Sequence, residues 1–205
     1  NLGVKNYVMQ MMFNTPPGND YKMDFARVLA MLAIVQPLLG EDFNIIKETR
    51  AGLAYFSPNS DMAKGQLVAS TMMQMSINPD IVHIVSYSEA DHAAKPEEII
   101  ESCTLVKKII QDCLTGLPDM KLDPEVIKRR NKLLNQAQIL LEFMLDYGKA
   151  LGYKDPYTSS DFLTELVRIG IFDAPQLNSS HLDIGNIRTR IIEGKCITVD
   201  EQGDP

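Results

Sequence analysis

The sequence predicts an α/β fold built around a parallel β-sheet. Three apolar runs begin near Tyr7, Asn44 and Ile81, at a constant interval of 37 residues. A polar loop and then a segment with helical periodicity follow each run. Short strands that alternate with amphipathic helices are typical of βαβ units. We therefore expect three parallel strands paired in chain order. Their polar loops should meet at the carboxyl ends of the strands, where α/β proteins bind their ligands.

The helices that follow these strands are marked by capping and turn residues. The first is predicted from about Asp24 to Gly40, because glycine often stops a helix. The second is predicted over residues 61–75, and its methionines are interpreted as adaptable core residues. They are Met62, Met72, Met73 and Met75. The third helix begins at Pro96, a favoured first helical residue, and ends at Gly116.

The pattern changes after the third unit. Asp123 and Pro124 are typical of an N-cap and a first helical residue, so a long helix is predicted from there to about Tyr147. A shorter helix is predicted from Ser160 to Gly170. The expected organisation is therefore three βα units over 1–117, additional helices that pack on them over 118–170, and a C-terminal tail over 171–205.

Composition limits the class of protein. With 205 residues, 45% apolar and 23% charged, the chain has the make-up of a globular domain with a sizeable core. A net charge of −7 without a Lys/Arg cluster argues against a nucleic-acid partner. The apolar runs are too short to span a membrane. The cysteines Cys103, Cys113 and Cys196 lack the spacing of a disulfide framework or zinc site, so we expect a cytoplasmic protein without a metal.

The loops after the predicted strands supply the candidate functional residues. A carboxylate, a guanidinium and an imidazole at neighbouring strand ends could bind and protonate a small polar substrate. The alternative is that these loop charges are solvated and cap helices. The candidates are Asn14, Asn19, Lys47, Glu48, Arg50, Tyr87, Glu89, Asp91 and His92.

The other histidines give weaker signals. His83 lies inside an apolar run and is interpreted as a core histidine rather than a catalyst. His181 lies in the tail and has no assigned partner. Asp91 and His92 beside Glu89 invite a metal interpretation, but one histidine with two loop carboxylates is more often solvent-facing. None of the common nucleotide, nucleophile-elbow or zinc-protease motifs occurs.

Three strands with their helices make an incomplete domain, because a parallel sheet needs cover on both faces. The chain starts with Asn1 and reaches the first predicted strand almost at once. One interpretation is a small open sheet. The other, which we favour, is a piece of a larger βα barrel from a longer polypeptide. The strand edge near Tyr7 should then pair with the missing N-terminal half of the barrel or with another copy of the chain.

The order of four segments resembles the carboxyl-terminal part of the large (epsilon) subunit of glutamate mutase, also called methylaspartate mutase. The likeness extends over roughly residues 3–190. It rests on Gly3-Val4-Lys5-Asn6, Phe56-Ser57-Pro58-Asn59, Ile84-Val85-Ser86-Tyr87-Ser88-Glu89-Ala90 and Gly170-Ile171-Phe172-Asp173-Ala174-Pro175. The resemblance implies a (β/α)8, TIM-type barrel whose mouth is capped by adenosylcobalamin on a separate small subunit or domain. The first strand here would be the sixth of eight, and the third strand the last.

The resemblance also implies three cofactor-binding positions. Phe56 matches a phenylalanine that touches the cofactor, and Glu89 matches a glutamate that contacts the adenosyl ribose. Ser86 stands where the family has a lysine. The Asp-x-His-x-x-Gly motif that ligates cobalamin is absent, since Asp91 and His92 are adjacent. The implied function is radical isomerisation of a small amino or carboxylic acid by a carbon-skeleton mutase, for which the chain supplies part of the barrel.

Two other functions remain open at this point. The chain could be a non-catalytic α/β interaction module that associates with other subunits. It could also be an unrelated small α/β enzyme that uses Glu89, His92 and Arg50.

Overall fold

The computed structural model describes residues 3–117, 119–175 and 187–205. The chain divides into two structural units, Asn1–Asn131 and Lys132–Pro205, called here the first and second unit. Among the described helices, none combines the length and the apolar character that crossing a bilayer requires.

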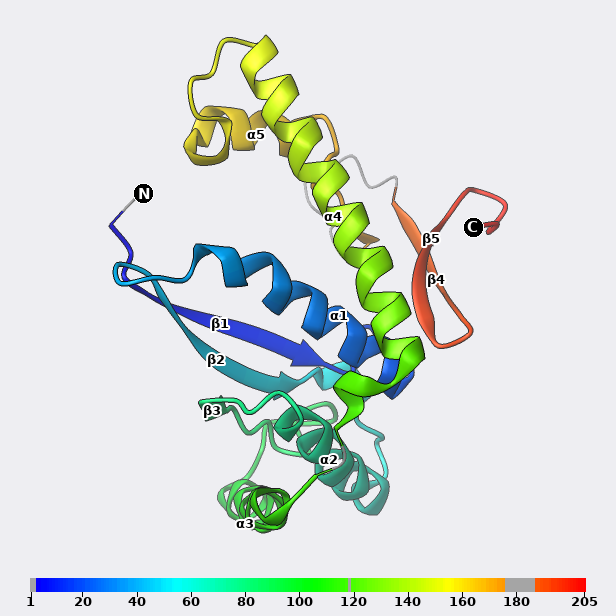
Figure 1. Ribbon diagram of the computed structural model, residues 1–205. Helices are drawn as coiled ribbons and strands as arrows, with labels where there is room; N and C mark the ends of the chain where they lie inside the picture. The colour runs from blue at the N-terminus through cyan, green and yellow to red at the C-terminus, as the bar shows by residue number, and fades with distance from the viewer. Residues whose placement is uncertain (1–2, 118, 176–186) are drawn as a thin grey trace. The chain divides into compact units, whose positions relative to one another are not determined.

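The first unit contains the predicted parallel sheet. Its strands are β1 (Asn6–Phe13), β2 (Asn44–Ala51) and β3 (Ile81–Val82). They are hydrogen-bonded in the order β1-β2-β3, and both pairs are parallel. Figure 1 shows them in chain order, with α1 beside β1 and with α2 and α3 beyond β3. The α/β class, the parallel pairing and the chain order are therefore confirmed. Over the described residues, this sheet has three strands and is open.

The third strand is shorter than the sequence predicts. Of the apolar run from Ile81 to Tyr87, only the first two residues pair as a strand. The N–H of His83 still donates to the Thr49 carbonyl at 2.8 Å. The chain then leaves the sheet, because a turn in which the Glu89 N–H bonds the Ser86 carbonyl at 3.1 Å replaces the ladder.

The helices of the first unit begin where side chains cap them. They are α1 (Tyr21–Val35), α2 (Ser60–Met75) and α3 (Pro96–Thr115), and α4 (Pro124–Ala150) starts in the same unit. Asp20 accepts from the Met23 N–H at 2.8 Å, which starts α1 three residues before the predicted Asp24. Asn59 caps α2 by accepting from the Met62 N–H at 3.0 Å. Short 3₁₀ segments connect elements over the described residues: Gln36–Leu38, Leu53–Tyr55, Met120–Leu122 and Pro156–Thr158.

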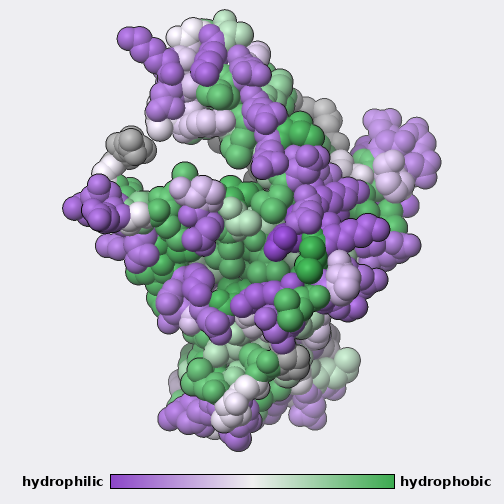
Figure 2. All heavy atoms as spheres, viewed as in Figure 1, coloured by the Kyte–Doolittle hydropathy of each residue, from purple (hydrophilic) through white to green (hydrophobic). Residues whose placement is uncertain are grey.

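The two faces of the sheet have different environments. On one face Met9, Met11 and Phe13 are at most 4% exposed, and they share a core with residues of α1 and α2, among them Phe25 and Met73. A second core joins β2 to α2 and α3. Side chains alternate along a strand, so the other face carries the even-numbered residues. They include Val8, Gln10, Met12, Ile46, Glu48 and Arg50, all of them exposed or half-buried. Figure 2 shows hydrophobic surface over the region of β1 and β2.

The methionines of α2 divide between core and surface. Met73 and Met75 are 4% and 7% exposed, in agreement with the prediction of core residues. Met62 and Met72 are 61% and 48% exposed, so for these two positions the prediction was wrong. The reason is the position of each residue on the helix, since only one side of α2 faces the sheet and α3.

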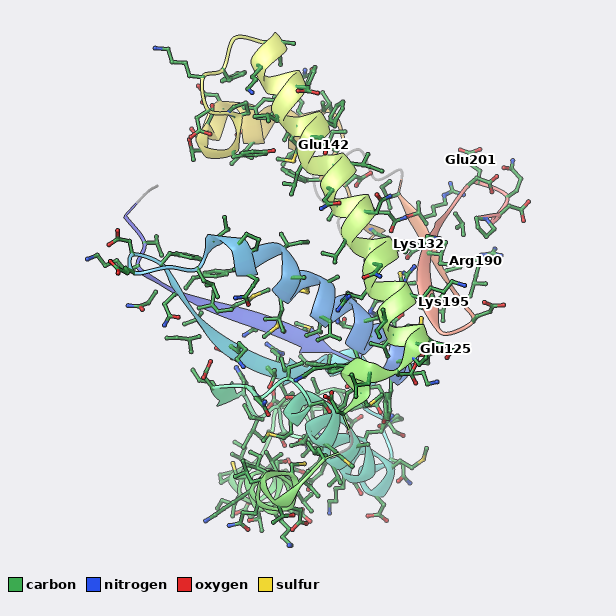
Figure 3. The ribbon with its side chains drawn as sticks, viewed as in Figure 1. Glu125, Lys132, Glu142, Arg190, Lys195 and Glu201 are labelled. Atoms are coloured by element: carbon green, nitrogen blue, oxygen red, sulfur yellow. The ribbon has the colours of Figure 1, made fainter. Side chains whose placement is uncertain are left out.

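The second unit holds the rest of α4, then α5 (Ser160–Arg168) and a hairpin of β4 (Arg188–Ile192) and β5 (Lys195–Val199). Met144, Phe162 and Leu166 form its core. The α4 helix continues through Gly148 instead of stopping at Tyr147. A Cβ on Gly148 would lie 2.5 Å from Pro156, so glycine lets this turn pack closely. Figure 3 labels Lys132 and Glu142 on α4 and Arg190 and Lys195 on the hairpin.

The hairpin lies within 171–205, the segment that was predicted to be a tail. Its two-residue turn is Glu193-Gly194, with φ of 48° and 72°. Two positive φ values are typical of the tight turns that join hairpin strands. Glu-Gly is a weaker signal than Asn-Gly or Asp-Gly, so the sequence does not reveal this turn. His181 lies outside the described residues.

Candidate functional site

The loop after β1 is held by a buried polar network. Asn14 has a φ of 58° and is 3% exposed. Its N–H donates to the Asp24 carboxylate, and its Oδ1 accepts from the Ser70 hydroxyl at 2.6 Å. Asp24 pairs with Arg27 at 2.5 Å, and Gln74 donates to the Ser70 hydroxyl at 2.9 Å. These side chains fix the loop to α1 and α2, so Asn14 is a structural residue here.

Two further candidates also bond to backbone. Asn19 donates from Nδ2 to the Thr15 carbonyl at 3.3 Å. Lys47 donates from Nζ to the carbonyls of Ile77, at 3.0 Å, and Asn78. Lys47 therefore secures the loop between α2 and β3, at the amino end of β3, away from the carboxyl ends where the sequence placed it.

A chain of serine hydroxyls links the loop after β3 to α3. Ser86 is 2% exposed, and its hydroxyl lies 3.1 Å from that of Ser88 and 3.2 Å from that of Ser102. The Ser86 N–H donates to Glu89 Oε1 at 2.8 Å, so the glutamate closes its own turn. Glu89 itself is exposed. Of the two cofactor positions on this loop, only Glu89 thus presents its side chain to solvent.

The serine chain continues into a group of ionisable side chains at the start of α3. Ser88 donates to Glu98 Oε2 at 3.1 Å, and Glu98 also accepts from the Lys95 N–H at 2.8 Å. His92 Nδ1 lies 3.0 Å from Asp91, and its Nε2 lies 3.0 Å from Glu98. Hydrogen bonding to Asp91 and then to Glu98 raises the pKa of His92 above its ordinary value. The Lys95 N–H and then His92 lower the pKa of Glu98.

We expect Asp91→Asn to lower the pKa of His92, and Glu98→Gln to lower it as well. The imidazolium bonds a carboxylate on each ring nitrogen, and the loss of either partner disfavours the charged ring. Because the folded pKa is raised, the stabilisation from this cluster is present below the unfolded pKa and is lost as pH rises through the folded value. Histidine ring signals followed by NMR against pH measure the shift. Glu97→Gln, on the same turn of α3, is the matched control. An unchanged His92 titration in both variants would contradict the role of these carboxylates.

Phe56 lies in the core of the first unit. It is 6% exposed and belongs to the cluster that includes Leu67, Val85 and Val106. Its loop follows β2, whereas the loop of Glu89 follows β3, so parallel pairing places both loops at the carboxyl edge of the sheet. Tyr87 also packs in this cluster, and its hydroxyl donates to Glu101 at 2.7 Å. Phe56 and Tyr87 therefore both help to anchor these loops.

The open face of the sheet carries a second polar group. Gln10 Nε2 donates to Glu48 Oε1 at 2.7 Å, and His83 Nδ1 lies 3.1 Å from the same oxygen. The side chain of His83 is 46% exposed, so its interpretation as a core histidine was wrong. The hydrogen bond from Gln10, and then that from His83, lowers the pKa of Glu48. Residues of β1 and β2 and the residue that directly follows β3 therefore form one carboxylate-centred group, which we call the strand-face cluster: Gln10, Glu48, Arg50 and His83.

The sequence identified only part of this cluster. Glu48 and Arg50 were candidates because they precede the loop after β2. Gln10 and His83 were not chosen, since each lies within an apolar run. The available signal was the alternation of side chains on paired strands: Gln10 is the register partner of Glu48, and Glu48 that of Ile81. The residue two positions after Ile81 is His83, which therefore lies on the same face.

Within the described part of the chain, no group of three or more His, Cys, Asp or Glu side chains is arranged to hold a metal ion. No protein-family model matches the chain, and no curated protein matches it.

Proposed function

We propose that the three βα units are part of a (β/α)8 barrel, in the barrel subunit of a carbon-skeleton mutase. The observation that supports the barrel is the arrangement of the sheet. Its strands run in chain order, and α1 and α2 share a core with one face of it. A barrel keeps this arrangement through all of its strands, whereas a doubly wound sheet keeps it only within each half and reverses its strand order between the halves.

The polar character of the open face supports the same proposal. In a barrel this face turns toward the lumen, and functional residues lie near the carboxyl ends of the strands. Glu48 and Arg50 occupy the second half of β2, and His83 directly follows β3. A packed barrel interior would be fully apolar. Polar side chains at these positions are better explained by the binding of a small polar molecule. The enclosing barrel would exclude water from the reaction.

The mutase chemistry is proposed from the resemblance to glutamate mutase. Its reaction would isomerise a small amino or carboxylic acid by a radical route. Adenosylcobalamin, held mainly by a separate small subunit or domain, supplies the radical when bound. Of the three implied cofactor positions, Glu89 fits, because its carboxylate is exposed and accepts hydrogen bonds. Phe56 and Ser86, at 6% and 2% exposure, do not offer a surface to such a ligand.

The alternative is a non-catalytic interaction module. It is favoured by the edge position of β1, where Tyr7 and Val8 are 46% and 45% exposed. An edge strand that has exposed apolar side chains and few charges can pair readily with a strand of another chain.

We expect Glu89→Gln to weaken adenosylcobalamin binding by roughly tenfold, because the hydrogen bond from the ribose then has a neutral acceptor instead of a charged one. Equilibrium dialysis followed by corrinoid absorbance measures the dissociation constant for the full chain. Glu97→Gln, also exposed, is the control and should bind as the unmodified chain does.

Adenosylcobalamin binding that is equal in Glu89→Gln and in the unmodified chain would contradict the role of Glu89 as a cofactor contact. If light scattering also shows self-association, the interaction module becomes the better explanation.

A further inference from the structure

The strand-face cluster is the group of side chains whose contacts point most directly to a ligand. Gln10, Glu48 and Arg50 lie on the exposed side of β1 and β2, and His83 joins them from the end of β3. The pairing of adjacent strands, rather than one flexible loop, holds these groups together.

The geometry determines which ring nitrogen of His83 carries the proton. An ionised carboxylate only accepts hydrogen bonds, and Glu48 has a lowered pKa. His83 Nδ1, 3.1 Å from Glu48 Oε1, must therefore be the donor. The neutral ring then has its lone pair on Nε2. Gln10 donates to the same Oε1 at 2.7 Å and holds the carboxylate in this orientation. A carboxylate that fixes the tautomer of an exposed imidazole is the arrangement that prepares histidine to accept a proton.

Arg50 supplies a positive charge next to this pair. Its Nε lies 3.4 Å from the Ala51 carbonyl, a long contact on one nitrogen. In the described part of the chain, its two terminal nitrogens form no hydrogen bond or ion pair. A guanidinium with its fork available binds a carboxylate through two parallel hydrogen bonds. Met12 is the β1 register partner of Arg50 and gives the site an apolar border.

We propose that the strand-face cluster binds a small organic acid, with Arg50 holding the carboxylate and His83 Nε2 accepting a hydrogen bond from a neighbouring hydroxyl group. Glu48 and Gln10 are positioning residues that act through His83. If the hydroxyl gives up its proton, the proton moves to Nε2, and the imidazolium that forms faces the Glu48 carboxylate. This inference rests on the proposed function, because the cluster then lines the barrel lumen.

The test is an NMR titration of the full chain with glycolate, which carries a carboxylate and a hydroxyl group. The Arg50 Nε–Hε signal and the His83 Nε2 signal should both shift. Arg130, on α4 and bonded only to its neighbour Asn131 in the described residues, is the internal reference. Ethylene glycol, which lacks the carboxylate, should leave Arg50 unchanged. Equal responses of Arg50 and Arg130 to glycolate, or no response, would overturn the proposal.

Variants separate the roles within the site. Arg50→Gln should weaken glycolate binding roughly tenfold or more, while Arg130→Gln leaves it unchanged. Glu48→Gln should alter the ¹⁵N shifts of His83 toward a mixture of tautomers, a signature that a purely structural role would not produce. Unchanged His83 tautomers in Glu48→Gln would remove Glu48 from its positioning role.

The titration contains no corrinoid, so its outcome is independent of the dialysis experiment. Selective glycolate binding without adenosylcobalamin binding would retain this site and count against the mutase. The opposite result would retain the mutase proposal and end the case for the strand-face cluster.

Discussion

Phe56→Ala should lower the free energy of unfolding of the first unit by about 3–5 kcal/mol, the usual cost of removing a buried aromatic side chain. Phe56 is 6% exposed and packs in the core that joins β2 to α2 and α3. Its loss leaves a cavity at the point where the loop after β2 is anchored. Urea unfolding followed by circular dichroism measures the change.

A matched control for this variant is Phe172→Ala, at a phenylalanine that is 38% exposed. Replacement there should change stability by about 0.5 kcal/mol or less. An opposite pattern, with stability intact and adenosylcobalamin binding weakened in Phe56→Ala, would restore Phe56 as a cofactor contact.

Asp24→Asn should destabilise the first unit by about 2–3 kcal/mol. Asp24 is 1% exposed, bonds the Asn14 N–H and pairs with Arg27. Removing its charge leaves the guanidinium without its charged partner, although Arg27 still donates to the Met12 carbonyl. The effect stays below that of a fully buried pair, since the side chain of Arg27 is 30% exposed and keeps some hydration.

The control for Asp24→Asn is Asp61→Asn. Both aspartates occupy the first turn of a helix, but Asp61 is exposed. Thermal unfolding of the two variants separates the buried network from a general effect of the helix dipole, which contributes about 0.3–1 kcal/mol. Equal destabilisation of both variants would show that the network around Asn14 adds nothing.

The elements that the sequence predicted well are those with local signals. The interval between Tyr7, Asn44 and Ile81 marks the starts of β1, β2 and β3 to within one residue. Pro96 and Gly116 mark the first residue of α3 and its cap, as expected. These signals work because capping and strand periodicity depend on residues close together in the chain.

The sites were harder to predict because they depend on contacts between distant segments. Phe56 precedes a polar stretch and resembles an exposed loop residue in the sequence, yet α2 and α3 bury it. Lys47 looks like a strand-end charge, but its ammonium group donates a hydrogen bond to a backbone carbonyl in the loop after α2. Burial and pairing of this kind depend on tertiary packing, and a single sequence does not reveal those contacts.

The sequence by itself determined the α/β class, the parallel order of strands and most helix starts, because each follows from periodicity and caps within one segment. Only the tertiary structure decided which polar groups meet. Gln10 and His83 are far apart in the chain, and strand pairing brings both to one oxygen of Glu48. The early end of β3 was also a tertiary outcome, since hydrogen bonds within the turn from Ser86 to Glu89 replace the ladder. In each case contacts between segments outweigh the local preference of the residues.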